Sequence, residues 1–313
     1  MRLPAAIAVV VAVVATSSAS VGVGAPARLT WAPPSLSSPI TISVTNANRR
    51  LFLDDSRDYR LRIVEPLQRE LWIEGGRNVV VIGGHVTLDT VGEDGPYGDN
   101  TAVKVRFGNP RGTVHIEGLL VDGPYVVDGV AIATGRTVQI QNVRVERAHD
   151  EIKGAHADCV QVQAGVGHLR MDRFSCVTER QGIFLDDQGG PIGGADLRRL
   201  TLVAAGGQHL LWQTRPASAV SLRDVWLGIA QGFKAWAPFG YWVYPQRDGR
   251  TYLGSFNRAR HSVVSRDGKR LWFVGSRISG FVRKVPTGAH YDYVPARTVG
   301  TAYASPGYLR SPG

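Results

Sequence analysis

The sequence of 313 residues lacks most of the features that mark common folds and cofactor sites. No window of about 10–15 residues repeats its apolar positions with a helical period, which argues against helical bundles and doubly wound α/β folds. No Gly-rich phosphate loop follows a strand, and no serine stands in a nucleophile elbow. There are two cysteines, poorly spaced for a metal, and no tight pair of histidines on one strand face, so a zinc site is disfavoured.

Long apolar segments are also missing after the N-terminus. An apolar stretch over residues 5–14 is followed by small residues up to Ala25. It is shorter than the ~20 residues that cross a bilayer, and it is typical of a secretory signal. We therefore predict a signal peptide at residues 1–25 and a secreted, monomeric chain without a membrane span. Export permits a disulfide between Cys159 and Cys176, but a buried free thiol explains the sequence equally well.

What the chain does contain is a strand-length pattern that occurs six times, with copies that start 24 to 35 residues apart. It reads apolar, any, apolar, any, any, apolar, any, apolar. Each unit is too thin to bury its apolar face alone, so this period predicts stacked coils. The copies are Val79, Val81, Gly84, Val86; Val114, Ile116, Leu119, Val121; Val138, Ile140, Val143, Val145; Leu169, Met171, Phe174, Cys176; Ala195, Leu197, Leu200, Leu202; and Val220, Leu222, Val225, Leu227.

A second, shorter strand with alternating apolar residues precedes each later copy. Its inward pairs are predicted to be Val103 with Val105, Val130 with Ile132, Val160 with Val162, Ile183 with Leu185, and Leu210 with Trp212. We expect an N-terminal cap with strands at residues 40–44 and 59–64, and β-helix coils up to residue 227. Residues 228–313 are expected to form the last coils, a hairpin at 260–274, and an irregular aromatic and basic segment that packs on the helix.

Two runs of residues carry a resemblance to a known family. They are Gly75-Gly76-Arg77-Asn78-Val79-Val80-Val81-Ile82-Gly83-Gly84 and His156-Ala157-Asp158-Cys159-Val160-Gln161. Together with the coils, they resemble secreted bacterial right-handed parallel β-helix proteins of the pectate-lyase-like superfamily. The resemblance covers residues 59–227 and implies an all-β, right-handed parallel β-helix, or solenoid. That superfamily includes lyases, hydrolases, esterases, epimerases and proteins without known catalysis, so the fold does not fix the function.

Stacking places equivalent residues of successive coils about 4.8 Å apart. One outward column is predicted to read Arg106, Ala133, Gln163, Asp186, Gln213, and the next Lys104, Ala131, Gln161, Phe184, Leu211. The amides and the carboxylate form a ladder that suits the hydroxyls of a sugar chain, although an ordinary solvated sheet face has the same composition. Phe184 and Leu211 indicate that the aromatic C-terminal stretch covers part of this face. His209 lies further along the same face.

The longest turn, residues 146–158, is the second candidate site, because long turns on a rigid stack often carry function. Eight of its thirteen residues are ionisable. His156 and Asp158 stand where the turn rejoins a strand, and Arg180 of the next coil is expected beside Asp158. A mobile solvated loop is the alternative reading.

Ionisable residues of this kind serve two types of reaction on polysaccharides. Inverting hydrolysis needs two carboxyl groups about 6.5–9.5 Å apart, whereas Asp158 and Asp186 are five residues apart along the strand direction, or roughly 16 Å. β-Elimination on a uronate needs a base and a cation. Lys153 or His156 is a candidate base, and Arg180 is a candidate cation. The other candidate cation is a Ca²⁺ held by Asp150, Glu151 and Asp158. Ca²⁺ takes six to eight oxygens, whereas these residues supply three carboxylates.

The formal net charge is +10, and the excess lies after residue 227, with 13 Lys or Arg against 3 Asp or Glu. A basic segment favours a polyanion, although an arginine-rich composition accounts for it as well. We therefore expect an exported protein that binds an acidic polysaccharide, with cleavage by elimination as its candidate reaction and with no nucleic-acid partner. The alternatives are a non-catalytic glycan-binding or structural surface protein, and a glycoside hydrolase.

Overall fold

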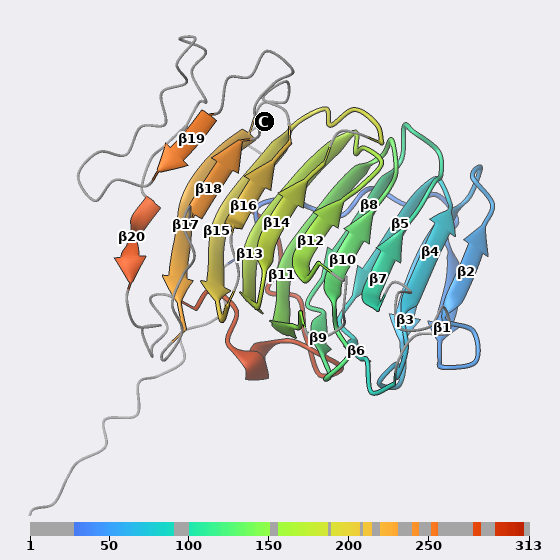
Figure 1. Cartoon of the computed structure of the whole chain (residues 1–313). Helices are drawn as coiled ribbons and strands as arrows, with labels where there is room; N and C mark the ends of the chain where they lie inside the picture. The colour runs from blue at the N-terminus through green and yellow to red at the C-terminus, as the bar shows by residue number, and fades with distance from the viewer. Residues whose placement is uncertain are drawn as a thin grey trace, which may run out of the picture.

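The computed structural model describes residues 28–90, 100–150, 156–186, 189–206, 209–214, 220–230, 240–243, 252–255, 278–282 and 292–309. The predicted signal peptide, Glu151, Lys153 and the hairpin at 260–274 lie outside these ranges. Within them the chain is a right-handed parallel β-helix whose coils stack side by side (Figure 1). None of the described segments is a helix long and apolar enough to cross a membrane.

Two sheets make up the walls of the helix in the described part of the chain (Figure 1). Nine strands of the eleven-stranded sheet follow one another in the order β1 (Ile40–Val44), β3 (Asp58–Ile63), β5 (Asn78–Ile82), β8 (Thr113–Glu117), β11 (Thr137–Ala148), β13 (His168–Thr178), β15 (Ala195–Ala204), β17 (Val220–Ile229), β20 (Ile278–Val282). The other two are β6 (His85–Thr87), which pairs with β9 (Leu120–Asp122), and β9, which also pairs with β11. The nine-stranded sheet runs β2 (Arg50–Leu53), β4 (Leu71–Gly75), β7 (Thr101–Val105), β10 (Asp128–Ile132), β12 (Asp158–Val162), β14 (Gln181–Leu185), β16 (His209–Gln213), β18 (Gly240–Val243), β19 (Tyr252–Ser255). Every described pair of strands is parallel except β18 with β19.

The six copies of the sequence pattern form the eleven-stranded sheet in the predicted register. Val79, Val114, Val138, Leu169, Ala195 and Val220 are paired in one continuous column. These side chains are at most 5% exposed and belong to one apolar core. Strands β1 and β3, which were expected in the cap, pair in parallel with β5 and so form the first rungs of the same sheet.

The backbone conformation explains why each copy of the pattern has two adjacent variable positions at its centre. In five of the six copies the second of them has a positive φ, at 71° in Gly83, 72° in Gly118, 51° in Asn142, 53° in Arg173 and 47° in Arg199. A left-handed residue bends the strand, so the apolar positions on both sides of the bend face the core. The pattern is therefore two short strands joined at a corner.

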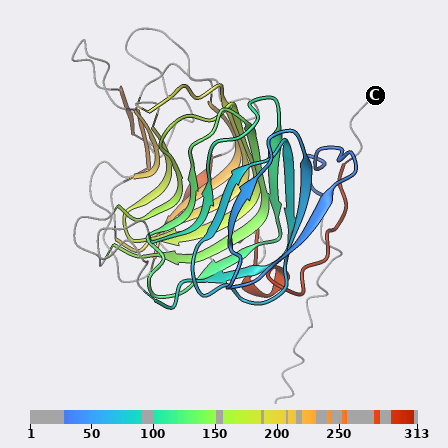
Figure 2. The ribbon, with the colours of Figure 1, turned by 90° about the vertical axis from the view of Figure 1, so that its right-hand side faces the viewer.

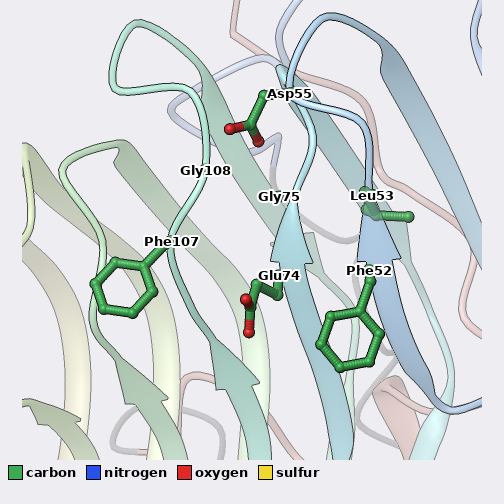
Figure 3. A pocket seen from close by; sticks show the side chains of 7 residues that line it. All are labelled: Phe52, Leu53, Asp55, Glu74, Gly75, Phe107 and Gly108. Atoms are coloured by element: carbon green, nitrogen blue, oxygen red, sulfur yellow. The ribbon is translucent and has the colours of Figure 1, made fainter.

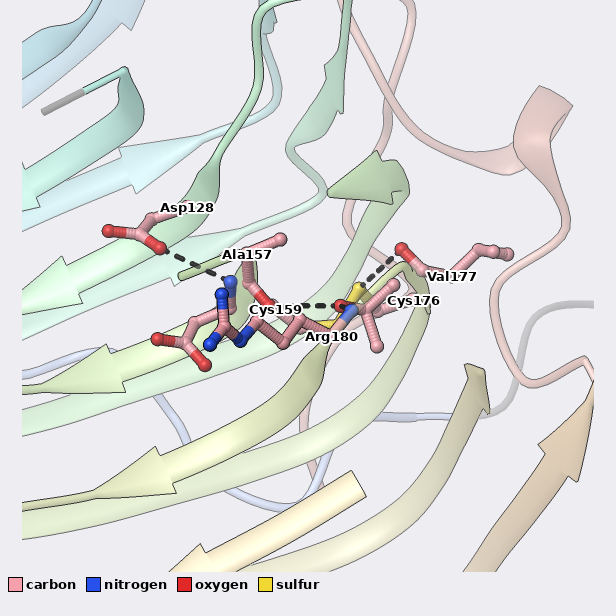
Figure 4. Close-up of a disulfide and its surroundings, with 8 residues drawn as sticks. Asp128, Ala157, Cys159, Cys176, Val177 and Arg180 are labelled. Carbon is pink, nitrogen blue, oxygen red and sulfur yellow. Dashed lines mark hydrogen bonds between the residues drawn. A yellow bond between two sulfur atoms is a disulfide. The ribbon is translucent and has the colours of Figure 1, made fainter. Parts of the chain in front are cut away.

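A disulfide joins Cys159 of β12 to Cys176 of β13, with the Cα atoms 6.1 Å apart. The sequence left a bridge and a buried free thiol open, and the bridge is what forms. It ties one sheet to the other within a single coil, across the apolar core (Figure 4). The bridge thereby fixes the start of β12, where the long turn ends, relative to the last residues of β13.

The C-terminal residues 292–309 lie along the outside of the eleven-stranded sheet, in red in Figures 1 and 2. Arg144 of β11 pairs with Asp292 at 2.7 Å, and the hydroxyl of Tyr303 donates to the buried carboxylate of Glu117. These contacts occupy the outer surface of one sheet. A ligand site on the strands is therefore sought on the other, nine-stranded sheet.

Candidate functional site

Two groups of side chains on the nine-stranded sheet carry chemistry. The edge cluster lies where β10, β12 and β14 begin, and contains Asp128, Asp150, His156, Asp158 and Arg180. The outer-face cluster lies on the first strands of the sheet, and contains Arg50, Trp72, Lys104 and Arg106.

Asp128 and Asp158 form the centre of the edge cluster. They are paired in adjacent strands, and the backbone N–H of Asp158 donates to Oδ1 of Asp128 at 3.2 Å (Figure 4). Asp158 is fully buried, and neither of its carboxyl oxygens has a hydrogen-bond partner among the described residues. Burial raises the pKa of Asp158 well above its ordinary value, and the neighbouring Asp128 raises it further, against the opposing charge of Arg180.

This burial changes the role expected of Asp158. The sequence placed it among both the catalytic residues and the calcium ligands. In the structure its side chain has no solvent exposure, and the raised pKa favours the neutral carboxyl. A carboxyl group in that state neither contacts a sugar from solvent nor ligates a cation, so Asp158 supports the cluster from beneath the surface.

Arg180 forms an ion pair with Asp150, with 3.1 Å between Nη1 and Oδ1, and makes no hydrogen bond to Asp158. Glu179 holds Asp150 in place by accepting its backbone N–H at 2.9 Å. Asp150, a predicted calcium ligand, is therefore engaged in an ion pair. In the part of the chain that the structure describes, no three acidic, histidine or cysteine side chains gather around a cation site, and Glu151 lies outside that part.

His156 is the exposed member of the edge cluster. Partial burial lowers its pKa, and the positive charge of Arg180 lowers it further, while Asp150 opposes both. The imidazole is therefore neutral at neutral pH and able to accept a proton. The structure brings together His156, Asp158 and Arg180 as the sequence predicted, whereas Lys153 lies outside the described ranges.

The outward ladder differs from the prediction in its last coil. Leu211 and Gln213 pair with the inward residues Ile183 and Leu185, and both are 1% exposed. The predicted outward position of Gln213 was therefore wrong, since a shift of one residue turns each side chain to the opposite face. Trp212 takes the outward position and stacks on Phe184, with ring centroids 4.3 Å apart.

The remaining ladder residues lie as follows. Gln161 aligns with Phe184 and is 8% exposed, and Gln163 is exposed at the end of its strand. Asp186 accepts a hydrogen bond from the hydroxyl of Thr214 at 3.1 Å, so Thr214 stands where Gln213 was expected. The backbone of His209 pairs with Gln181 at the first position of β16. Of the aromatic stretch at 233–244, only 240–243 are described, and these extend the sheet as β18.

The outer-face cluster surrounds a single indole ring. The distances to the centroid of Trp72 are 5.0 Å from Nζ of Lys104, 5.6 Å from Cζ of Arg106 and 6.0 Å from Cζ of Arg50. The indole N–H donates to Glu74 at 3.1 Å. Three cations within about 6 Å of one ring form cation–π contacts. Glu74, and Glu70, which pairs with Arg50 at 2.7 Å, offset part of their positive charge.

Sequence reasoning missed Trp72 and Asp128. Trp72 is aligned with Lys104 because Leu71 and Ile73 continue the inward pairs one coil earlier. That period-2 alternation was the available signal. Asp128 aligns with Asp158, so a stacked carboxylate pair exists where none was expected. The predicted separation of Asp158 from Asp186 along the strand direction is confirmed. Asp158 pairs with Gln181 at the start of β14, whereas Asp186 comes directly after Leu185, which pairs with Val162 at the end of β12.

Comparison of the chain with protein-family models, curated proteins and solved structures finds no match in any of the three. The case for a function therefore rests on the side chains of the two clusters and on their positions in the fold.

Proposed function

We propose that this protein is exported and binds an acidic polysaccharide along the outer face of the nine-stranded sheet. The observation that carries the proposal is the outer-face cluster, in which Lys104, Arg106 and Arg50 surround Trp72. Lys104 is only 4% exposed. Its charge therefore adds to the potential at this face, while the more exposed Arg50 and Arg106 contact the ligand directly. Export and membership of the pectate-lyase-like superfamily belong to the same proposal, supported by residues 1–25 and by the parallel coils.

The residues further along the face support a linear ligand. Beyond Ala131 of β10, Gln161 and Phe184 continue the outward column that contains Trp72 and Lys104. Neighbouring strands are about 4.8 Å apart, so polar and aromatic side chains are offered at regular intervals along the stack. An extended sugar chain has hydroxyls and apolar ring faces at regular intervals as well.

Removing two of the cations tests this proposal. The double variant Lys104→Ala, Arg106→Ala is expected to bind a polyuronate about tenfold more weakly, because two charged contacts of roughly 0.5–1 kcal/mol each are lost. Isothermal titration calorimetry with oligogalacturonate and oligoalginate at low salt measures the change. Arg60→Ala is the matched control, because Arg60 is an exposed arginine of β3 on the other sheet. Equal affinities for the double variant and the wild type would contradict the proposal.

The edge cluster supports a second, catalytic candidate, which is β-elimination on the bound uronate. His156 is the base that removes the C5 proton next to the sugar carboxylate, and its lowered pKa keeps it neutral. A C4–C5 double bond then forms as the C4–O glycosidic bond breaks, and the departing oxygen takes a proton from the imidazolium or from water. Arg180 is the cation that offsets the charge developing on that carboxylate, and it exchanges Asp150 for the substrate. If the edge cluster only stabilises the turn, the protein binds the polysaccharide without cleaving it.

A further inference from the structure

A separate pocket of about 320 Å³ opens beside the outer-face cluster, between the ends of β2, β4 and β7. Phe52 and Phe107 stand on its two sides, with Glu74 between them and Asp55 above (Figure 3). The volume lies at the lower end of the range for small-molecule sites, which begins near about 300 Å³. Aromatic sides with a few converging polar groups are the usual composition of such sites.

The two phenylalanines are unusually exposed, with 72% of the Phe52 surface and 57% of the Phe107 surface open to solvent. The strand pairing sets their spacing. Phe52 aligns with Glu74, and the backbone N–H of Gly75 donates to the carbonyl of Phe107 at 2.6 Å. Phe52 and Phe107 are therefore two strands apart and one residue out of register, so their backbones lie roughly 10 Å apart at the usual strand separation and rise. A ring-shaped group fits a backbone separation of this size, above Glu74 and between the two phenylalanines.

A buried guanidinium makes this pocket rigid. Arg136 is 0% exposed and donates to the carbonyl oxygens of Gly75 at 2.6 Å and Arg106 at 2.9 Å, both beside the pocket. A Cβ added to Gly108 would lie 2.6 Å from the Arg136 guanidinium, so the pocket backbone rests directly on this cation. The pocket is therefore formed before any ligand enters.

The charges around the pocket balance. Asp55 and Glu74 supply two carboxylates, Arg136 attracts Asp55 from behind, and Arg106 lies 5.3 Å from the Phe107 ring centroid. A uronate would meet the two carboxylates at close range, whereas a neutral ring with hydroxyl donors would not be repelled. The carboxylates accept hydrogen bonds, and the phenyl rings contact apolar C–H faces.

We propose that this pocket binds a neutral pyranose unit between Phe52 and Phe107, with its hydroxyls donating to Glu74 and Asp55. The inference rests on the proposed function for the class of ligand and adds to its specificity. The polysaccharide that fits both sites contains uncharged sugar units as well as acidic ones, with the acidic units at Lys104 and Arg106.

Saturation-transfer NMR on the full chain tests the pocket with three kinds of probe. These are methyl glycosides of neutral hexoses, a methyl uronoside, and tetramethylammonium as a cation that aromatic pockets also take. The wild type is expected to show transfer to the ring protons of a neutral glycoside. Phe52→Ala and Phe107→Ala are each expected to weaken this binding about fivefold to tenfold, the equivalent of one lost aromatic contact. Val64→Ala, which removes an exposed apolar side chain elsewhere, is expected to leave it unchanged.

The outcomes separate the two proposals. Absence of transfer to every neutral glycoside, stronger binding of the uronoside or of tetramethylammonium, or equal affinities in both phenylalanine variants overturns the pocket assignment. If polyuronate binds and neutral glycosides do not, the pocket assignment fails alone. If neutral glycosides bind through the phenylalanines and polyuronate does not bind, the proposed acidic-polysaccharide function fails alone.

Discussion

Arg136→Met is expected to lower the free energy of unfolding by about 3–5 kcal/mol, because the methionine keeps the volume but leaves buried acceptors without donors. The guanidinium donates to the carbonyls of Gly75, Gly76 and Arg106 and to the hydroxyl of Thr134. Burial lowers the pKa of Arg136 to about 10, so the group is still a cation at neutral pH. One side chain thus joins the turns of three successive coils.

Denaturant unfolding measures the effect of Arg136→Met, with Arg111→Met as the matched control. Arg111 is exposed in the turn between β7 and β8, and a surface substitution of this kind changes stability by about 0.5 kcal/mol or less. A loss below about 1 kcal/mol for Arg136→Met would show that the carbonyls find other donors, and that the turns do not depend on this residue.

In the proposed β-elimination, His156→Ala is expected to slow the reaction by about 10²–10⁴-fold, the usual contribution of a general base, and to leave the proposed binding of polyuronate unchanged. The pH dependence has a defined sign. The base form of His156 is the neutral one, and its pKa is lowered from 6.5. The rate should therefore rise with pH through a midpoint below 6.5 and then become constant.

The ultraviolet absorbance of the unsaturated uronate follows this reaction across a pH series. His168→Ala is the control, because His168 lies at the start of β13 and pairs with Asp196. A variant without His156 that retains the full rate, or a wild-type rate that falls as pH rises through the same range, would place the base elsewhere. Reducing ends that appear without the absorbance would indicate hydrolysis instead.

The repeat predicts most of the fold because it encodes burial directly. In the column from Val79 to Val220, an apolar residue recurs wherever the stack must exclude water. Parallel stacking then fixes which residues are neighbours, and this was sufficient to separate Asp158 from Asp186. The same reasoning brought His156, Asp158 and Arg180 to one edge of the nine-stranded sheet.

Two errors arose where the pattern is ambiguous or where burial depends on the third dimension. In β16 the residues Leu210, Leu211 and Trp212 are all apolar, so period 2 does not determine which of them face the core. The burial of Asp158 was not predictable, because it depends on how the coil closes around the carboxyl group and not on the spacing of residues. The pocket between Phe52 and Phe107 also depends on the path of the turn after β7, which carries no repeat.

The central claim is that the outer face of the nine-stranded sheet binds an acidic polysaccharide. Hydrogen exchange of the full chain with and without a polyuronate oligosaccharide tests it most directly. Binding at this face is expected to slow exchange in residues 100–112, which include Lys104, Arg106 and the turn after β7, and to leave exchange unchanged in residues 292–309 on the opposite sheet. Protection confined to residues 292–309 and the strands beneath them, or no protection on any polyuronate, would contradict it.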